Sequence, residues 1–173
     1  MRKPYNDLTP NKLAIVRDAV DYIVMKMLKG INKPVKIGMT VFFGKAYPLL
    51  HLTRDYGLVL DALSRLRIMG EGSAPGDGVI ISVKILRRVY GGKDIVMITD
   101  GGFNMGIPLD VASIYAKNSS VRLTIVSLGK IRDSDALVIE QAVKATGGMM
   151  FNIETKAELY SSLKKIVEQI MGK

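Results

Sequence analysis

Apolar positions along the chain follow two patterns, one typical of helices and one typical of buried strands. Residues such as Val16, Val20 and Ile23 recur at helical spacing between about positions 11 and 28. By contrast, 94–99 and 121–128 are short continuous apolar runs, which are typical of strands covered on both faces. The predicted order is helix 11–28, strand 36–43, strand 46–52, helix 54–66, a helix from 79 to about 89, strand 94–99, helix 108–117, strand 121–128, helix 133–146, strand 149–153 and helix 155–171.

Strands that alternate with helices of this length predict an α/β fold in three layers, with a mostly parallel sheet and helices on both faces. Only Gly44 and Lys45 separate the first two strands, which favours an antiparallel hairpin whose second strand lies at the sheet edge. The parallel crossovers should be right-handed. Residues 1–173 contain no linker, repeat or low-complexity segment, so we expect one domain.

Residues at the predicted helix ends have the expected capping chemistry. Thr9 followed by Pro10 predicts the start of the first helix, and Thr53 is the predicted cap of the second. Gly147 is the left-handed stop expected after helix 133–146. Thr155 and Glu158 have the spacing of a capping box for the last helix.

Composition excludes several classes of site. The chain has no cysteine, so disulfides, thiolate metal sites and cysteine nucleophiles are excluded, and its single histidine, His51, cannot form a multi-histidine site. The longest apolar runs are too short to span a bilayer and no signal peptide is visible, which favours a cytoplasmic location without membrane contact. The net charge of +9 admits an acidic partner or a nucleic acid. We expect a generic basic surface, because no nucleic-acid-binding motif is present.

Ligands of open parallel sheets bind at the carboxyl ends of the strands. This rule directs attention to loops 44–45, 101–106 and 129–132, and to Asp100, which ends a central strand. The carboxylate of Asp100 could hold a hard cation, or it could accept hydrogen bonds from the backbone of the next loop. Position alone leaves both interpretations open.

The glycine-rich loop 70–78 (GEGSAPGDG) does not match a phosphate-binding loop. A helix precedes it and it contains no lysine, and its glycines do not have the spacing of a dinucleotide fingerprint. Ser73 in this loop could approach a metal or an anion, or could stabilise a turn. Glu71 and Asp77 could act as general bases, although most acids in loops are solvated. His51 has no serine elbow to complete a triad, so we expect a structural role for it.

Several segments together resemble the von Willebrand factor type A (vWA) family. Residues 95–102 (IVMITDGG) are similar to the motif that ends the family's fourth strand, and loop 70–78 resembles its G-G-T-A-x-G-x-A segment. Segments 12–23, 38–43 and 145–151 are also similar to the family pattern, in the expected order. The resemblance covers nearly the whole chain and implies a Rossmann-like fold.

The resemblance implies a metal-ion-dependent adhesion site (MIDAS), in which Mg²⁺ is held at the top of the sheet and a carboxylate from the partner completes the coordination. Ser73 matches the family's threonine ligand and Asp100 its aspartate ligand. The family's D-x-S-x-S motif and first strand have no match, so residues 1–173 resemble an N-terminally incomplete vWA domain. We therefore expect a remnant site, with Mg²⁺ bound in a longer form and none bound by this chain.

The function implied by the resemblance is binding of another protein, without catalysis. A Mg²⁺-dependent hydrolase or phosphotransferase using Asp100 is the first alternative, but only one well-placed carboxylate is visible. A basic nucleic-acid-binding domain is the second, and we do not expect sequence-specific binding. Because the family's first strand lies between its second and fourth, 36–43 and 95–99 should lack a neighbour. We expect them to pair directly, or to borrow a strand from another copy in a homodimer.

Overall fold

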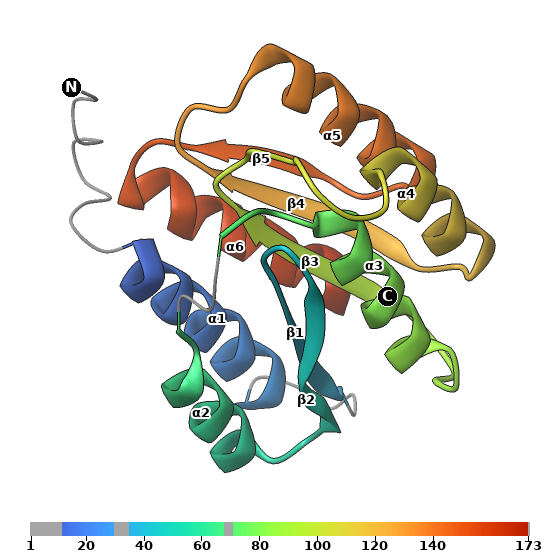
Figure 1. Ribbon diagram of the computed structural model, residues 1–173. Coiled ribbons are helices and arrows are strands. Elements are labelled where there is room, and N and C mark those ends of the chain that lie inside the picture. Colours follow the sequence, from blue (N-terminus) through green and yellow to red (C-terminus); the bar gives the residue numbers. More distant parts are fainter. Residues whose placement is uncertain (1–11, 30–34, 68–70, 173) are drawn as a thin grey trace.

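The computed structural model describes residues 12–29, 35–67 and 71–172, and the fold is α/β (Figure 1). Its elements, in chain order, are α1 (Lys12–Lys29), β1 (Ile37–Phe42), β2 (Ala46–Thr53), α2 (Tyr56–Arg65), α3 (Pro75–Leu86), β3 (Asp94–Thr99), α4 (Leu109–Asn118), β4 (Arg122–Leu128), α5 (Asp133–Thr146), β5 (Met150–Ile153) and α6 (Lys156–Met171). The predicted α/β order is confirmed throughout the described residues.

The strands form two sheets. β3, β4 and β5 lie in that order in a parallel sheet, and Ile95 is in register with Leu123. This agrees with the mostly parallel sheet predicted from the apolar runs 94–99 and 121–128. β1 and β2 form the predicted antiparallel hairpin, which begins its pairing at Phe42 and Ala46 beside the turn.

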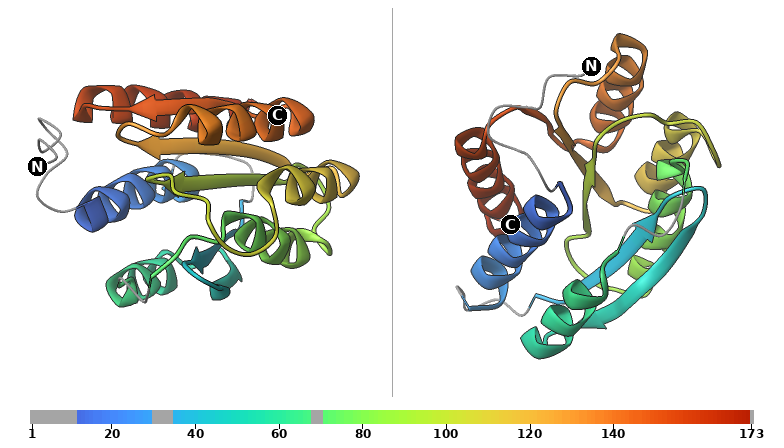
Figure 2. Two further views of the ribbon diagram at one scale, coloured as in Figure 1. Left: turned by 45° about the horizontal axis from the view of Figure 1, so that its top comes forward. Right: turned by 60° about the vertical axis from the view of Figure 1, so that its left-hand side comes forward.

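Helices cover both faces of the parallel sheet, as Figure 2 shows from two sides. On one face is the α3–α4–α5 cluster, which includes Val83, Ala112 and Ile139 from those helices and Ile95 and Ile125 from the sheet. On the other face is the α1–α6 cluster, whose buried members are Ile15, Ala19, Ile23, Met27, Val126, Leu128, Ile153, Leu159, Leu163 and Ile166. The predicted three-layer arrangement is therefore confirmed.

The expected direct pairing of β1 with β3 is wrong. Among the described residues, β1 is hydrogen-bonded only to β2 and β3 only to β4. The hairpin is held by side chains instead, since Ile37, Met39 and Leu50 pack on Val24 of α1 and on α2. Its register also shifts twice, on either side of Met39, and such irregularities increase the twist of a strand.

Two predicted helix starts are also wrong. The helix after the glycine-rich loop begins at Pro75, inside the segment assigned to the loop, because proline has a backbone angle suited to the first helical position. Asp55 caps α2 in place of Thr53: its carboxylate accepts from the N–H groups of Gly57 and Leu58. Thr53 Oγ1 instead accepts from the N–H of Asp55.

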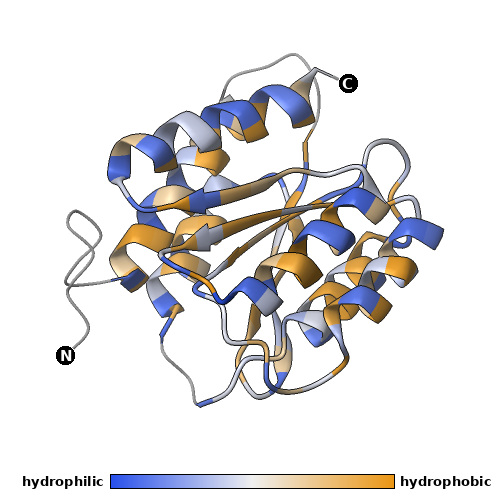
Figure 3. Cartoon of the chain, turned by 90° about the horizontal axis from the view of Figure 1, so that it is seen from above, coloured by the Kyte–Doolittle hydropathy of each residue, from blue (hydrophilic) through white to orange (hydrophobic). Residues whose placement is uncertain are grey.

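Other predicted helix ends are confirmed. Gly147 ends α5 with a φ of 72°, and Thr155 and Glu158 form both hydrogen bonds of the capping box of α6. The predicted cap at Thr9 and Pro10 lies outside the described residues. Within the described ranges no helix is both long and apolar enough to cross a membrane. Figure 3 shows the mostly apolar strands lying between helices of mixed character.

Candidate binding site at the carboxyl edge of the sheet

Three loops meet at one edge of the molecule, and we call them the edge loops: 43–45 after β1, 71–74 before α3, and 100–107 after β3. Ala74 N donates to the carbonyl of Phe43 at 2.7 Å, which joins the first two loops. Ser73 joins the second to the third, because its N–H donates to Asn104 Oδ1 at 2.9 Å and its carbonyl accepts from Asn104 N at 3.2 Å. The expected convergence of loops at the carboxyl ends of strands is thus present for β1 and β3.

Close packing fixes the start of α3 against loop 100–107. Asp77 Oδ1 accepts a hydrogen bond of 2.8 Å from the N–H of Ile107. A Cβ at Gly106 would lie 2.7 Å from Asp77 Oδ2, and Gly106 has a φ of 75° that favours glycine. A Cβ at Gly76 would clash with the carbonyl of Ile107. Asp77 therefore orders the loop and is not a free general base.

The carboxylate of Asp100 lies at the exposed side of this edge, with 58% of its side chain accessible to solvent. Its Oδ2 is 2.8 Å from Nζ of Lys12, the first described residue of α1. The carboxylate of Asp100 is therefore already paired with a positive charge through its Oδ2. This contact also places the start of α1 beside the carboxyl end of β3.

A second carboxylate near the edge, Asp135, was not among the residues singled out from the sequence. It lies in the first turn of α5 with 9% of its side chain exposed, and it forms two hydrogen bonds with Arg132, of 2.9 and 3.1 Å. Its Oδ2 also accepts from the N–H of Gly102 at 3.2 Å, which fastens loop 100–107 to α5. The available signal was the pair of acids, Asp133 and Asp135, at a helix start, where negative charge is favoured.

The donor set at the edge does not fit a Mg²⁺ site. The loops carrying Ser73 and Asp100 are in contact, but the hydrogen bonds of Ser73 to loop 100–107 use its backbone, and Asp100 is paired with Lys12. No group of three or more acidic or histidine side chains in the described residues is arranged to hold a metal ion. Mg²⁺ gives up its water ligands reluctantly, so the few oxygen ligands available here cannot replace them well.

Two other candidates from the sequence, His51 and Glu71, are exposed to solvent. His51 is a residue of β2. Glu71 is exposed, and its carbonyl accepts from the N–H of Gly44. The glycine-rich loop follows α2 and precedes α3, so it lacks the preceding strand that a phosphate-binding loop needs.

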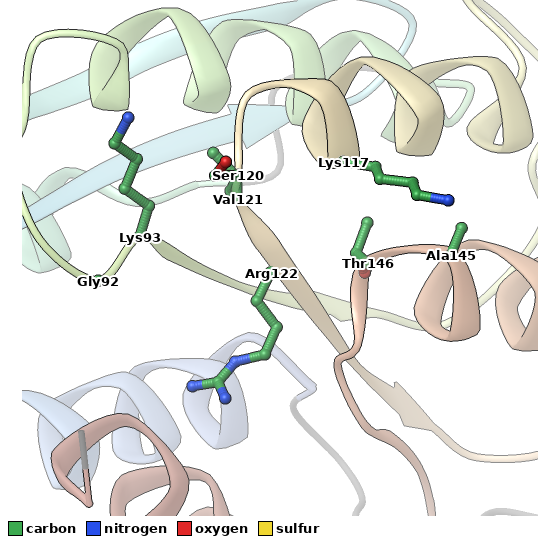
Figure 4. A pocket seen from close by; sticks show the side chains of 8 residues that line it. All are labelled: Gly92, Lys93, Lys117, Ser120, Val121, Arg122, Ala145 and Thr146. Atoms are coloured by element: carbon green, nitrogen blue, oxygen red, sulfur yellow. The ribbon is translucent and has the colours of Figure 1, made fainter.

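A hollow of about 280 Å³ lies at the opposite end of the sheet, where β3 and β4 begin (Figure 4). Lys93 and Lys117 line it, together with Thr146 at the end of α5. The guanidinium of Arg122, which also lines it, is paired with Asp94 at 2.6 Å. The carbonyl ends of α4 and α5 face this region and disfavour an anion, so its lysines do not by themselves define a site.

Solved structures similar to this chain include a von Willebrand factor type A protein and a protein with a MIDAS motif. BatB from Bacteroides thetaiotaomicron, a conserved hypothetical protein, is 19% identical with a TM-score of 0.79, and the match covers 96% of this chain and 90% of that one. A von Willebrand factor type A protein from Catenulispora acidiphila is 18% identical with a TM-score of 0.75, covering 94% and 39%. Proximal thread matrix protein 1 from mussel byssus, with a zinc-occupied MIDAS motif, is 18% identical with a TM-score of 0.75, covering 93% and 41%.

Sequence comparison adds no closer relative, since no family model and no curated protein matches the chain. The structural similarity extends over nearly all of this chain and establishes the class of fold. The chain has the fold of a von Willebrand factor type A domain. This confirms the resemblance seen in segments 70–78 and 95–102.

Proposed function

We propose that this domain binds another protein through the edge loops, at the position where the related fold carries its adhesion site, and that it catalyses no reaction. The observation that carries the proposal is the exposed Asp100–Lys12 pair, in which Asp100 lies on a loop fixed by Ser73, Asp77 and Asp135. A rigid edge that presents one charged pair suits recognition of a partner. It offers little for hydrolysis, which needs several groups to hold a metal and activate water.

The Asp100–Lys12 ion pair determines which charged groups of a partner the edge loops can bind. Ser73 and Asp100 are the remnant of a metal site, and the ammonium of Lys12 supplies the positive charge next to Asp100. A carboxylate from the partner would bind this ammonium directly, without a bridging cation. Since 46% of the Lys12 side chain is exposed, the group is accessible to such a partner.

The experiment compares capture of partners by the full chain and by charge variants. Lys12→Glu should reduce recovery of the bound protein at least about tenfold, because its carboxylate would face the partner's carboxylate and like charges across an interface are strongly unfavourable. Arg65→Glu on α2 is the matched control, because it makes the same charge change and the Asp61–Arg65 pair has the same 2.8 Å separation and similar exposure. Equal recovery with Lys12→Glu and Arg65→Glu would exclude the edge as the binding surface.

Two further measurements separate this proposal from its alternatives. Calorimetric titration with Mg²⁺ should show weak or no binding, and tight binding lost in Asp100→Asn would contradict a metal-free site. Turnover of p-nitrophenyl phosphate in the presence of Mg²⁺ that disappears in Asp100→Asn would favour the hydrolase instead.

A further inference from the structure

Tyr90 is fully exposed in the loop 87–93, which joins α3 to β3. Its relative exposure is 100%, although a tyrosine ring is a large, mostly apolar group. Gly91 and Gly92 follow it directly. Gly91 has a φ of 98°, and a Cβ built on it would meet nothing within 4 Å, so open space surrounds this part of the loop. The ring of Tyr90 therefore contributes nothing to the packing of the domain.

Basic side chains gather at the same end of the molecule, in the last turns of α3 and α4 and in the segments that follow α3 and precede β3. They are Lys84, Arg87, Arg88, Lys93 and Lys117. The ends of α3 and α4 lie on the same side of the molecule (Figure 1), and the hollow at the start of β3 is lined by both Lys93 and Lys117. We call these side chains, together with Tyr90, the basic pole.

The charge of the basic pole is not neutralised by the rest of the fold. Within the described ranges none of its basic side chains forms an ion pair. Asp94 and Glu140, on neighbouring elements, are already paired with Arg122 at 2.6 Å and Lys144 at 2.7 Å. The carboxyl ends of α3, α4 and α5 each count for about half a negative charge, so together they offset only part of the positive charge. The pole is a net positive surface.

The arrangement of these charges does not match a small anion or a nucleic acid. Lys93 and Lys117 point in different directions from the rim of the hollow (Figure 4), so they do not converge on one phosphate. Single-stranded nucleic acid is bound by a series of aromatic platforms, whereas Tyr90 is the one exposed aromatic residue between positions 84 and 122. Divergent bases on separate elements instead match an extended plane of negative charge.

We propose that the basic pole docks this domain on the surface of an anionic lipid bilayer. The lysine and arginine side chains contact the phosphate and carboxylate groups of the lipids, and the ring of Tyr90 enters the interfacial layer. This layer accepts an amphipathic ring without a preformed pocket, which fits a ring that no part of the described fold covers.

The contact is peripheral, because no helix in the described ranges could cross the bilayer. It differs from the absence of membrane contact expected from the hydropathy of the sequence. Hydropathy records apolar runs along the chain, whereas the basic pole is assembled in space from separate segments.

Docking through the basic pole leaves the edge loops accessible. The pole lies where β3 begins, and Asp100 lies where β3 ends, at the opposite end of the sheet. A docked domain therefore presents the Asp100–Lys12 pair away from the bilayer. The inference is independent of the proposed function, since Lys12→Glu leaves the pole unchanged and vesicle binding does not report on the edge loops.

The test is co-sedimentation of the full chain with vesicles of phosphatidylcholine alone or with about 30% phosphatidylserine, at about 0.15 M salt. Binding should be at least about tenfold tighter to the anionic vesicles, and salt of about 0.5 M should weaken it strongly by screening. The double variant Arg87→Glu, Arg88→Glu should bind the anionic vesicles at least about tenfold more weakly. The matched control is Lys164→Glu, Lys165→Glu, which makes the same charge change at two adjacent exposed bases of α6.

Insertion of the exposed ring is tested separately. The chain has no tryptophan, so the fluorescence of the Tyr90→Trp variant reports on this position alone. Its emission should shift to shorter wavelength with anionic vesicles and stay unchanged with neutral ones, because the indole leaves water for the interfacial layer. Tyr90→Ser should weaken vesicle binding by about threefold or more.

Equal binding to neutral and anionic vesicles would overturn the proposal. An equal loss in the Arg87, Arg88 variant and in the α6 control would do the same, since net charge alone would then explain the binding. An unshifted emission spectrum of Tyr90→Trp would also contradict it. So would binding of a thymidine oligonucleotide of about twenty residues without binding to anionic vesicles, which would assign the pole to nucleic acid.

Discussion

β4 and β1 are both short apolar strands between helical layers, yet their surroundings differ. β4 has a parallel neighbour on each side and is buried from Leu123 to Leu128. β1 has one antiparallel neighbour, and all six of its residues are half-buried. The difference shows that apolar character alone does not complete a sheet, because backbone groups on both edges of a strand also need partners. The core of this domain is therefore centred on β4.

Truncation of one side chain in each strand tests this comparison with the largest effect. Ile125→Ala in β4 removes a side chain from a residue with 0% exposure and should lower the free energy of unfolding by about 2–5 kcal/mol. Ile37→Ala in β1 should cost less than about half as much, because Ile37 is only half-buried. Urea unfolding of both variants measures the difference, and equal losses would mean that the hairpin belongs to the core as fully as β4.

The edge loops should be less tolerant of change than their position on the surface suggests. Gly106→Ala combines an unfavourable positive φ with a Cβ placed 2.7 Å from Asp77 Oδ2, and should cost about 2–4 kcal/mol. Gly102→Ala is the matched control, since its φ is 79° but nothing lies within 4 Å of the added Cβ, and should cost about 1–2 kcal/mol. Thermal unfolding compares the two, and an equal cost would show that loop 100–107 is not tightly held.

The Asp100–Lys12 pair should contribute little to stability. Both side chains are about half exposed, so a double-mutant cycle with Asp100→Ala and Lys12→Ala should give a coupling of about 0–1 kcal/mol. The same cycle on Asp61 and Arg65 should give a similar value. A much larger coupling at Asp100 would assign the pair a structural role and weaken its assignment to binding.

The smallest effect concerns the start of α6. Hydrogen bonds from the N–H groups of Glu154 and Thr155 lower the pKa of the Glu158 carboxyl. The lowered pKa means that the ionised group stabilises the fold above its unfolded pKa, and this stabilisation is lost as pH falls through the folded pKa. Glu158→Gln should therefore reduce the loss of unfolding free energy between neutral and acidic pH, as measured by unfolding experiments. An equal loss in the variant and the unchanged chain would show that the capping box does not govern this pH dependence.

The parallel half of the fold could be predicted from the sequence because its signals are local. The run 94–99 and the capping pair Thr155 and Glu158 each contain their own pattern, and both predictions were confirmed. The separation of β1 from β3 could not be predicted from the strand patterns, because it depends on how the side chains of the hairpin pack against α1 and α2 in three dimensions.

The candidate site was predictable only in part. The family resemblance directed attention to Ser73 and Asp100, and the loops that carry them do meet. The ion pair of Asp100 with Lys12 joins residues 88 positions apart, and no spacing rule indicates it. Asp135 was missed for the same reason, since its bond to Gly102 spans 33 positions.

Amide hydrogen exchange of the free protein tests the central claim, that the sheet is divided between β1 and β3. The account predicts slow exchange at every residue from Thr124 to Val126 in β4, where each amide faces a neighbouring strand. In β3 it predicts alternation, with Ile95 and Met97 slow and Val96 and Ile98 at least about tenfold faster. Uniformly slow exchange along β3 in the monomer would mean that a neighbouring strand already covers this edge, and would contradict the account.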